Sequence, residues 1–277
     1  MQEVDRHRAN EATPYVSVIM GIYNNTDTLR SAVNSILAQT FERWELIMCD
    51  DRSTDESYAL ACSIASQDNR IRVIRNEQNV GCNLVLNRCI EEARGRYIAI
   101  MDSDDWSHPQ RLEKQVKILD SNPQYAIVGS AVTHFDENGE YMTLHNAIRP
   151  QPTDFTTSIP HAHPSCMMRR RVALEAGLYK KDPRMQRVED YYFLASIYAL
   201  GYRGYNIPEA LIKYRDDNRA YARRTWHNRL NEVYTYRKAY RLLKLPFYYY
   251  PLLLRPILVG LLPRPIYHYL HRRPWLR

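Results

Sequence analysis

The stretch that decides the fold is Tyr-Ile-Ala-Ile-Met-Asp-Ser-Asp-Asp-Trp-Ser-His-Pro, residues 97–109, in which an apolar strand runs straight into three carboxylates. Asp102, Asp104 and Asp105 repel one another unless a proton or a cation lies among them. Hard divalent ions such as Mn²⁺ and Mg²⁺ take oxygen ligands, which water and phosphate complete when the protein supplies one or two carboxylates. The cluster therefore predicts a Mn²⁺ or Mg²⁺ site for a phosphorylated ligand at the end of a parallel strand. The alternative is an acidic helix start, but three acids directly after a buried strand exceed what capping needs.

Around this stretch, strand-like runs alternate with helical spacing, which is the pattern of βαβ units and predicts an α/β fold with a mostly parallel sheet. A helix after the aspartates should take Ser107 as its cap and place Pro109 in its first turn. A tight hairpin is expected at Asn138-Gly139. The expected strands and extended segments are 16–22, 45–49, 71–74, 97–101, 125–133, 165–169 and 207–214, and the expected helices include 55–66, 83–93, 172–176, 189–200 and 226–243.

The basic excess of the chain is confined to its C-terminal segment. The 277 residues carry a formal charge of +7, yet residues 241–277 contain seven Arg and Lys and no Asp or Glu, while the first 240 residues hold 31 of each sign. This balance disfavours a nucleic-acid-binding protein. Short apolar pieces rich in Tyr, Trp and Arg suit a bilayer interface. We expect 221–277 to be a helix followed by a membrane-associating tail; packing of the tail on the main domain, or on a second subunit of a homo-oligomer, is the alternative.

Cysteine usage and hydropathy indicate a reducing compartment. The five cysteines, at 49, 62, 82, 89 and 166, are odd in number, lack a Cys-x-x-Cys pair and lie in or beside apolar segments, which predicts reduced core thiols. The polar residues 1–14 form an N-terminal tail unlike a signal peptide, and no run reaches the roughly 20 apolar residues of a spanning helix. A cytoplasmic protein, attached peripherally to the cytoplasmic face of the inner membrane through its tail, is expected.

Four segments carry a resemblance to a known family: Gly21-Ile22-Tyr23-Asn24, Asp50-Asp51-Arg52-Ser53-Thr54-Asp55, Asp102-Ser103-Asp104-Asp105 and Glu189-Asp190. In open α/β sheets, ligands collect at the carboxyl ends of strands, where the first three segments lie. In this order and spacing the set resembles the family 2 glycosyltransferases of the GT-A fold, including bacterial enzymes that build surface polysaccharides. The resemblance implies a GT-A catalytic domain at 15–220, with a nucleotide-binding half at 15–133 and an acceptor-binding half at 134–220.

The resemblance also implies roles for single residues. Asp51 would accept the N3–H of a uracil, Asp104 would bind the metal with Asp102 near the ribose and the metal waters, and Asp105 would face the donor sugar. The donor-site residues so implied are Tyr23, Asn24, Asp51, Asn87, Asp102, Ser103 and Asp105.

On the acceptor side, Asp190 would be the general base, with Glu189 the second candidate for that role. His163 lies in an element expected under the acceptor site, and Arg215 and Arg219 would reach the diphosphate from a closing loop. Each of these residues also has a structural alternative. His163 would then be a structural histidine, the two arginines would be solvated, and Glu189-Asp190 would simply begin a helix. For Asp51 the alternative is a helix cap, although Asp55 is better placed for that role.

Two positions depart from the family pattern. Many relatives carry Ala-Arg-Asn where this chain has Val85-Leu86-Asn87, so an arginine aimed at the nucleotide is missing. The second strand ends in Asp-Asp-Arg-Ser rather than Asp-Asp-Gly-Ser. Arg52 therefore requires a turn that tolerates a side chain, or it supplies a charge that glycine cannot.

The chain is thus expected to be a metal-dependent inverting glycosyltransferase. We expect it to move a hexose from a nucleotide sugar, expected to be a UDP sugar, to a lipid-linked glycan in polysaccharide or lipopolysaccharide biosynthesis. A catalytically silent subunit that binds a sugar nucleotide or a glycan is the rival hypothesis. The presence of both the aspartate cluster and the Glu-Asp pair argues against it. A dinucleotide oxidoreductase is disfavoured because no Gly-x-Gly-x-x-Gly follows the first strand.

Overall fold

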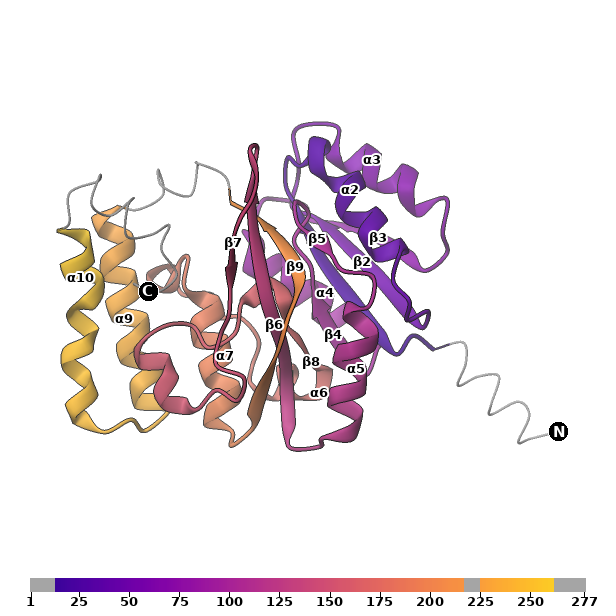
Figure 1. The fold of residues 1–277 in the computed structure, drawn as a ribbon. Helices are drawn as coiled ribbons and strands as arrows, with labels where there is room; N and C mark the ends of the chain where they lie inside the picture. The colour runs from indigo at the N-terminus through magenta and orange to yellow at the C-terminus, as the bar shows by residue number, and fades with distance from the viewer. Residues whose placement is uncertain (1–12, 217–224, 262–277) are drawn as a thin grey trace.

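One mixed sheet runs through the protein, which a computed structural model describes at residues 13–216 and 225–261 (Figure 1). Its nine strands lie in the order β3-β2-β1-β4-β8-β6-β9-β5, with β7 paired to β6. Strands β3, β2, β1 and β4 are parallel, β8 is antiparallel to both β4 and β6, and β9 is parallel to β6 but antiparallel to β5. The strands are β1 Val16–Ile22, β2 Trp44–Asp50, β3 Ile71–Arg75, β4 Tyr97–Ile100, β5 Trp106–Ser107, β6 Tyr125–Asp136, β7 Gly139–Leu144, β8 Met167–Arg169 and β9 Arg203–Arg215.

The side chains of the sheet alternate between two buried layers. On β1, Val18 and Met20 face helices α2, α3 and α5, whereas Ile19 faces α4, as the period of two requires. All seven residues of β2 are buried, which is typical of a parallel strand covered on both faces. Helices α6 and α7 complete the second layer. The helices are α2 Thr26–Leu37, α3 Ser57–Ala65, α4 Cys82–Glu92, α5 Arg111–Ser121, α6 Arg170–Glu175 and α7 Glu189–Ala199.

The expected elements are confirmed with small shifts at their ends, with one exception at the start of α5. The prediction that Ser107 caps this helix is wrong, because Ser107 belongs to β5 and pairs with β9. Its N–H donates to Ser35 Oγ at 3.0 Å. Helix α5 begins only at Arg111, so the prediction that Pro109 lies in its first turn is wrong as well. The hairpin at Asn138-Gly139 is confirmed: Gly139 joins β6 to β7 with a φ of 112°.

The five cysteines are free, as expected, but they are not all core residues. Cys49, Cys89 and Cys166 are buried, whereas Cys62 on α3 and Cys82 at the start of α4 are exposed. The prediction of core packing is therefore wrong for Cys62 and Cys82. Apolar neighbours in the sequence do not fix the side of a helix on which a residue lies.

The C-terminal segment folds back as a helical layer beside α7 (Figure 1). Helix α9, Trp226–Leu242, packs against α7, and the 3₁₀ segment η4, Phe247–Leu254, leads into α10, Arg255–Gly260, which returns along α9. Up to residue 261, the tail thus packs on the main domain, the alternative stated above. Residues 262–277, the rest of the expected membrane-associating tail, lie outside the described residues. Among the described helices, none combines the length and the apolarity that a membrane span requires.

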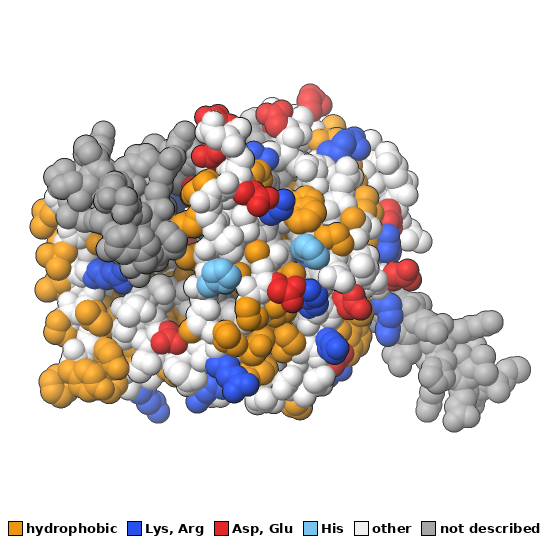
Figure 2. All heavy atoms as spheres, in the orientation of Figure 1, with side chains coloured by type: hydrophobic (Ala, Val, Ile, Leu, Met, Phe, Trp, Pro, Cys, Tyr) orange, Lys and Arg blue, Asp and Glu red, His pale blue; other side chains and the backbone are white. Residues whose placement is uncertain are grey.

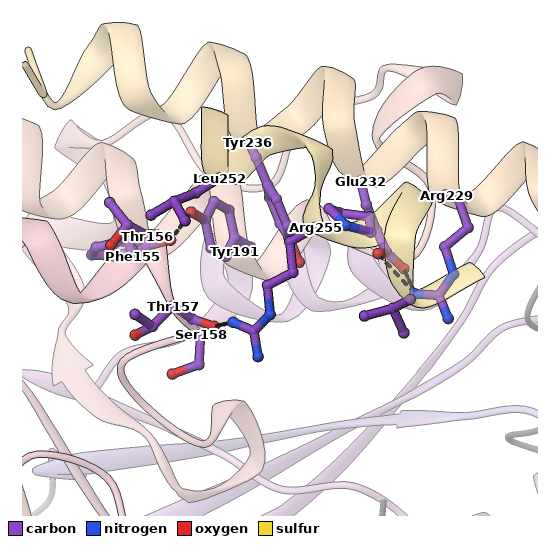
Figure 3. A pocket seen from close by; sticks show the side chains of 12 residues that line it. Phe155, Thr156, Thr157, Ser158, Tyr191, Arg229, Glu232, Tyr236, Leu252 and Arg255 are labelled. Atoms are coloured by element: carbon purple, nitrogen blue, oxygen red, sulfur yellow. Dashed lines mark hydrogen bonds and ion pairs between the residues drawn. The ribbon is translucent and has the colours of Figure 1, made fainter. Parts of the chain in front are cut away.

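The C-terminal layer carries exposed apolar side chains, among them Trp226, Leu230, Leu254 and Leu258. Figure 2 shows hydrophobic side chains along the edge of the molecule where α10 lies. Arg255 donates a hydrogen bond to the carbonyl of Thr157 (Figure 3).

Candidate functional site

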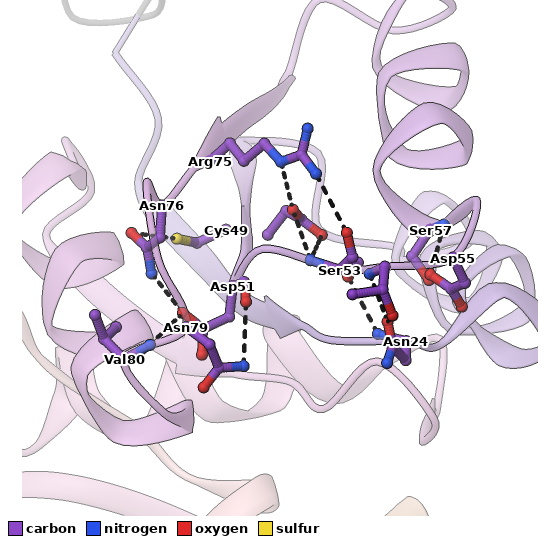
Figure 4. Close-up of polar contacts among 12 residues, drawn as sticks. Asn24, Cys49, Asp51, Ser53, Asp55, Ser57, Arg75, Asn76, Asn79 and Val80 are labelled. Atoms are coloured by element: carbon purple, nitrogen blue, oxygen red, sulfur yellow. Dashed lines mark hydrogen bonds and ion pairs between the residues drawn. The ribbon is translucent and has the colours of Figure 1, made fainter.

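The carboxyl ends of β2, β1 and β4 lie side by side in this order, and Asp51 directly follows β2. Its carboxylate is held by the loop after β3: Oδ1 accepts from Asn76 Nδ2 at 2.8 Å and from Val80 N at 2.9 Å, and Oδ2 accepts from Gly81 N at 2.8 Å (Figure 4). A carboxylate offers about four acceptor positions, so one position on Oδ2 is left. Asp51 is therefore fixed in orientation with one lone pair to spare.

The acids on either side of Asp51 have structural partners. Asp50 is fully buried, and its Oδ2 lies 3.0 Å from Arg75 Nε. Asp55 accepts from Ser57 N at 2.9 Å at the start of α3. Although desolvation opposes it, the hydrogen bonds from Ser57 and Thr26 lower the pKa of Asp55 to about 2. The N–H of the first residue of α3 is thus bonded by Asp55 and not by Asp51, and the N-cap position itself is Glu56.

Tyr23 and Asn24 lie in the turn after β1, which is bonded to the turn after β2. Ser53 Oγ accepts from Asn24 N at 3.1 Å, and Asn24 Oδ1 accepts from Thr54 N at 2.9 Å (Figure 4). Tyr23 is 48% exposed and free to meet a ligand. Arg52 has a φ of 64°, so the turn does tolerate a side chain where glycine is usual, in the left-handed region.

The three aspartates after β4 differ in their surroundings. Asp105 is 2% exposed, and its Oδ1 accepts from Arg215 N at 2.9 Å. Its Oδ2 is buried and finds no hydrogen-bond donor within the part of the chain that the structure describes. Asp102 and Asp104 are partly exposed, and Ser103 ties the loop to α2 by accepting from Thr28 Oγ1 at 3.0 Å.

Residues 102–105, here called the aspartate loop, differ from an ordinary acidic helix start in the pKa values of their carboxyl groups. Burial raises the pKa of Asp102 to about 6; the charge of Asp104 adds to this rise, and His163 opposes it. Burial, followed by the charges of Asp102 and Asp104, raises the pKa of Asp105 well above its usual range. The loop therefore concentrates negative charge that the surrounding protein only partly compensates.

Arg111, which the sequence analysis did not single out, lies behind the aspartate loop. Its side chain is fully buried, and Nη2 donates to the carbonyls of Ile100 at 2.7 Å and Pro164 at 3.1 Å. Within residues 13–216 and 225–261, no carboxylate oxygen is in ion-pair range of it, yet its charge lowers the pKa of Asp102. The signal in the sequence was its i, i+4 spacing to Gln115, whose Oε1 accepts from Arg111 Nε at 3.2 Å on the buried side of α5.

Glu189 and Asp190 open α7 next to the aspartate loop. The charge of Asp190 contributes to the raised pKa of Asp102, which places the two carboxyl groups within electrostatic range. Burial raises the pKa of Asp190 to about 6 and moves the pKa of Glu189 in the same direction. Asp190 Oδ1 accepts from Tyr191 N at 2.8 Å. A carboxylate with such a pKa can accept a proton at neutral pH.

Cys82 is a further residue of this site that the sequence analysis placed in the core. Its Sγ lies 3.9 Å from where a Cβ on Gly21 would be, at the end of β1. Desolvation of the sulfur by the surrounding protein, followed by the charges of Asp102 and Glu189, raises the pKa of the Cys82 thiol to about 12. The thiol thus lies among the predicted donor and base residues.

His163 and Asn87 meet at Tyr179. The imidazole Nε2 of His163 lies 2.7 Å from the Tyr179 hydroxyl, and the Asn87 amide bonds both the N–H and the carbonyl of Tyr179, at 2.9 and 2.8 Å. Burial lowers the pKa of His163, although Asp102 opposes the shift, so the ring is neutral at pH 7. Leu86, which replaces the family arginine, is buried in the core. Contact of Asn87 with a donor stays a prediction.

Arg215, at the end of β9, reaches the aspartate loop. Its Nε donates to the carbonyl of Asp104 at 3.2 Å, and its guanidinium lies 4.6 Å from the centre of the Phe135 ring. This position is next to the predicted metal ligands. Arg219 lies outside the described residues.

The aspartate loop fits a divalent cation but supplies only part of a coordination shell. The buried Oδ2 of Asp105, which has no donor among the described residues, and the raised pKa of Asp102 fit carboxylates that share a cation. Among the described residues, no three His, Cys, Asp or Glu side chains converge as a ready ligand set. One or two carboxylates suffice when phosphate oxygens and water complete the shell. The chemistry therefore fits a cation that binds together with a phosphorylated ligand.

A family profile described as Glycosyl transferase family 2 matches residues 17–178. The chain belongs to glycosyl transferase family 2. This family 2 enzyme is 37% identical over 261 residues to a Bacillus subtilis (strain 168) protein that carries the name glycosyltransferase EpsE, and the match covers 94% of each chain. It is 28% identical over 228 residues to the amylovoran biosynthesis glycosyltransferase AmsE of Erwinia amylovora, covering 80% of this chain and 84% of that one. The predicted family, with relatives in polysaccharide biosynthesis, is confirmed.

Solved structures confirm the GT-A fold of the family 2 enzyme. Staphylococcus aureus TarS 1–349, in complex with UDP-GlcNAc, superposes with a TM-score of 0.65 at 15% identity, over 91% of this chain and 82% of TarS. The mannosyltransferase PcManGT from Pyrobaculum calidifontis, in complex with GDP-Man and Mn²⁺, gives a TM-score of 0.65 at 19% identity, over 95% and 83% of the two chains. At these identities the likeness concerns the fold alone.

Proposed function

We propose that this glycosyltransferase moves a hexose from a nucleotide sugar, UDP-linked by preference, to a hydroxyl of a lipid-linked glycan, with inversion at the anomeric carbon. The setting is bacterial polysaccharide or lipopolysaccharide biosynthesis. The observation that carries the proposal is the aspartate loop: Asp102, Asp104 and the buried Oδ2 of Asp105 concentrate negative charge beside Asp190.

The donor nucleotide is proposed to bind at the ends of β1 and β2. The remaining acceptor position of Asp51 Oδ2 suits a ring N–H such as N3–H of uracil, and the exposed ring of Tyr23 offers a face for stacking. TarS binds UDP-GlcNAc and PcManGT binds GDP-Man, so guanosine is the natural competitor to test. Asn24, Asn87 and Ser103 are proposed as supporting donor-site residues.

Asp104 and Asp102 are the residues proposed to hold Mn²⁺ or Mg²⁺. When bound, the cation stabilises the charge that develops on the departing diphosphate, as a Lewis acid. Asp105, whose orientation the Arg215 backbone fixes, is proposed to face the donor sugar. Arg215, with Arg219 following it in sequence, is proposed to add positive charge near the diphosphate.

Asp190 is proposed to take the proton of the acceptor hydroxyl as that oxygen attacks the anomeric carbon from the face opposite the diphosphate. A single displacement of this kind inverts the anomeric configuration. Its pKa of about 6 leaves Asp190 ionised at neutral pH but still basic enough to accept a proton. Glu189 is the weaker candidate, because its carboxylate also accepts a hydrogen bond from Asn83. Neutral His163 is proposed to line the acceptor side.

Peripheral attachment to the cytoplasmic face of the inner membrane is proposed through the exposed apolar side chains of α9 and α10 together with the basic tail. Exposed leucines beside Arg and Lys suit a lipid interface that also presents a lipid-linked acceptor. Flotation with vesicles that contain anionic lipid tests this. Removal of residues 262–277 and the change Leu258→Glu should each weaken binding, and unchanged flotation of both variants would reject the attachment.

Calorimetry and product analysis test the proposed chemistry. With Mn²⁺ present, UDP should bind the wild-type enzyme, Asp104→Ala should weaken this binding at least tenfold, and Asp190→Asn should leave it nearly intact while abolishing transfer. A chain that binds nucleotide sugar but never hydrolyses or transfers it would support the rival, a catalytically silent binding subunit. Absence of heat with both UDP and GDP would remove the proposed donor site.

A further inference from the structure

A pocket of about 200 Å³ lies between α7 and the C-terminal helices, on the Asp190 side of the site (Figure 3). Tyr191, the residue after Asp190, forms one wall, and Tyr236 and Glu232 of α9 form another. No residue of the predicted donor site lines it. The pocket is therefore separate from the place proposed for the nucleotide.

Three successive carbonyls build the floor of this pocket. Phe155 accepts from the hydroxyl of Tyr191 on α7, and Thr157 accepts from Arg255 on α10. Between them, the carbonyl of Thr156 lies 3.4 Å from the hydroxyl of Tyr240 on α9. Each donor comes from a different helix, so the 155–157 segment fixes the three helices against one another. The pocket is thus a built feature of the fold rather than a loose gap at a domain edge.

The lining combines groups that recognise sugars. The rings of Tyr191 and Tyr236 pack on each other, 4.4 Å apart at an interplanar angle of 40°, and the half-buried Tyr236 offers apolar ring surface to the pocket. Arg229 Nη1 lies 3.0 Å from Glu232 Oε2, and only 13% and 22% of these side chains are exposed. The hydroxyl-bearing residues Thr157 and Ser158 complete the rim. A carboxylate and a guanidinium held together accept from and donate to vicinal hydroxyls, while an aromatic wall packs against the apolar face of a ring.

We propose that this pocket is a subsite for a neutral sugar residue of the acceptor glycan. The identification of an acceptor rests on the proposed function. The pocket also contains two guanidinium groups, but Arg229 is ion-paired with Glu232 and Arg255 donates to the carbonyl of Thr157. A neutral ring is therefore proposed rather than a phosphate or a uronic acid, which Glu232 would repel. The volume lies below the 300–1,000 Å³ typical of drug-sized ligands and leaves room for one ring rather than an oligosaccharide. Tyr191, which lines the pocket, directly follows Asp190 in α7, so a sugar held here would lie near the proposed base.

Saturation-transfer NMR on the full chain tests the subsite without an acceptor of known structure. The probes are the methyl glycosides of glucose, galactose, mannose and N-acetylglucosamine, with methyl glucuronide and inorganic phosphate as charged counterparts. At least one neutral glycoside should receive saturation, and Glu232→Gln and Arg229→Met should each reduce its signal at least fivefold. The matched controls Glu175→Gln and Arg171→Met alter the exposed pair on α6, 3.3 Å apart, and should leave the signal unchanged.

A further variant tests the pocket even if the ion-pair variants fail to fold. Val259→Trp places a large ring in the pocket from α10 without touching the ion pair, and it should block the same signal. The subsite is overturned if no neutral glycoside receives saturation, if the glucuronide or phosphate is preferred, or if folded variants bind as the wild type does. Binding of UDP with Mn²⁺ is measured in parallel, so that loss of the proposed donor chemistry and loss of the sugar subsite appear as separate results.

Discussion

Arg111 Nη2 lies 2.7 Å from the carbonyl oxygen of Ile100, the last residue of β4 before the aspartate loop. The same nitrogen lies 3.1 Å from the carbonyl of Pro164, next to His163. One buried cation therefore links the end of β4, just before the aspartate loop, to the segment that contains His163.

Replacement of Arg111 should lower the free energy of unfolding strongly, although no carboxylate among the described residues forms an ion pair with it. Arg111→Met removes this donor from the buried carbonyl of Ile100 and the half-buried carbonyl of Pro164, so the free energy of unfolding should fall by roughly 3 kcal/mol. Arg111→Lys should lower the free energy of unfolding by a smaller amount, because one ammonium group can replace only some of the hydrogen bonds of the planar guanidinium. Urea denaturation measures both. Arg96→Met, a change at a 56% exposed side chain that faces Asp120, is the control and should cost less than about 1 kcal/mol. Equal losses for the two methionine variants would contradict the clamp.

The raised pKa of Asp190 predicts a pH-dependent stability difference. Its folded pKa of about 6 exceeds the value of about 4 expected in the unfolded chain, so ionisation of Asp190 destabilises the fold. This cost is absent below about pH 4 and complete above about pH 6. Asp190→Asn should therefore be more stable than the wild type at pH 8 by on the order of 1–2 kcal/mol, and no more stable at pH 4. Thermal unfolding at the two pH values decides, and an equal gain at both would reject the buried carboxylate as the cause.

The same pKa sets the acid limb of the activity profile. If Asp190 is the base, transfer should fall about tenfold per pH unit below pH 6, because only the ionised carboxylate accepts a proton. Donor affinity is measured by calorimetry at each pH. The transfer rates are then corrected for the weaker donor binding that protonation of the aspartate loop should cause. A transfer rate that stays level down to pH 5 after this correction would point to another base.

Arg52 should be replaceable by glycine with a gain in stability. At a φ of 64° a residue with a Cβ is strained by about 1–2 kcal/mol, and part of this is offset by the greater freedom of glycine in the unfolded chain. Arg52→Gly should thus stabilise the protein by about 0.5–1 kcal/mol in urea. Arg30→Gly, at an exposed position inside α2, should instead destabilise by about 1 kcal/mol. If Arg52→Gly also raises the KM for the donor, the side chain contributes a charge to the nucleotide site.

Cys82 offers a chemical report on occupancy of the site. Its raised pKa leaves little thiolate at pH 7.5, so a maleimide should react with it slowly. UDP with Mn²⁺ should slow this reaction further by at least fivefold, while labelling of the exposed Cys62 on α3 stays constant. Peptide mass spectrometry distinguishes the two positions, with Cys82→Ser as the assignment control. Equal protection of both cysteines would indicate a global effect rather than a ligand beside Cys82.

Local sequence predicted the parts of this fold that depend on neighbouring residues. The apolar runs at 16–22 and 97–101 are strands because their side chains are buried on both faces, and Asp102–Asp105 follow the second run by simple adjacency. The failures concern distant partners. Ser107 looked like a cap because its pairing with Ile212 involves a strand more than 100 residues away. Arg111 and Cys82 acquire their surroundings only when α5 and α4 pack, and the i, i+4 spacing of Arg111 to Gln115 does not by itself reveal those surroundings.

The place of β9 in the sheet has a practical consequence for protein engineering. This strand, Arg203–Arg215, lies between β6 and β5, and its last residue donates a backbone hydrogen bond to Asp105. A fragment that ends near residue 133 would leave β5 without its partner and the aspartate loop without this brace. Chimaeras that exchange donor specificity between relatives should therefore transplant residues 203–215 along with the first 133, as two grafts rather than one.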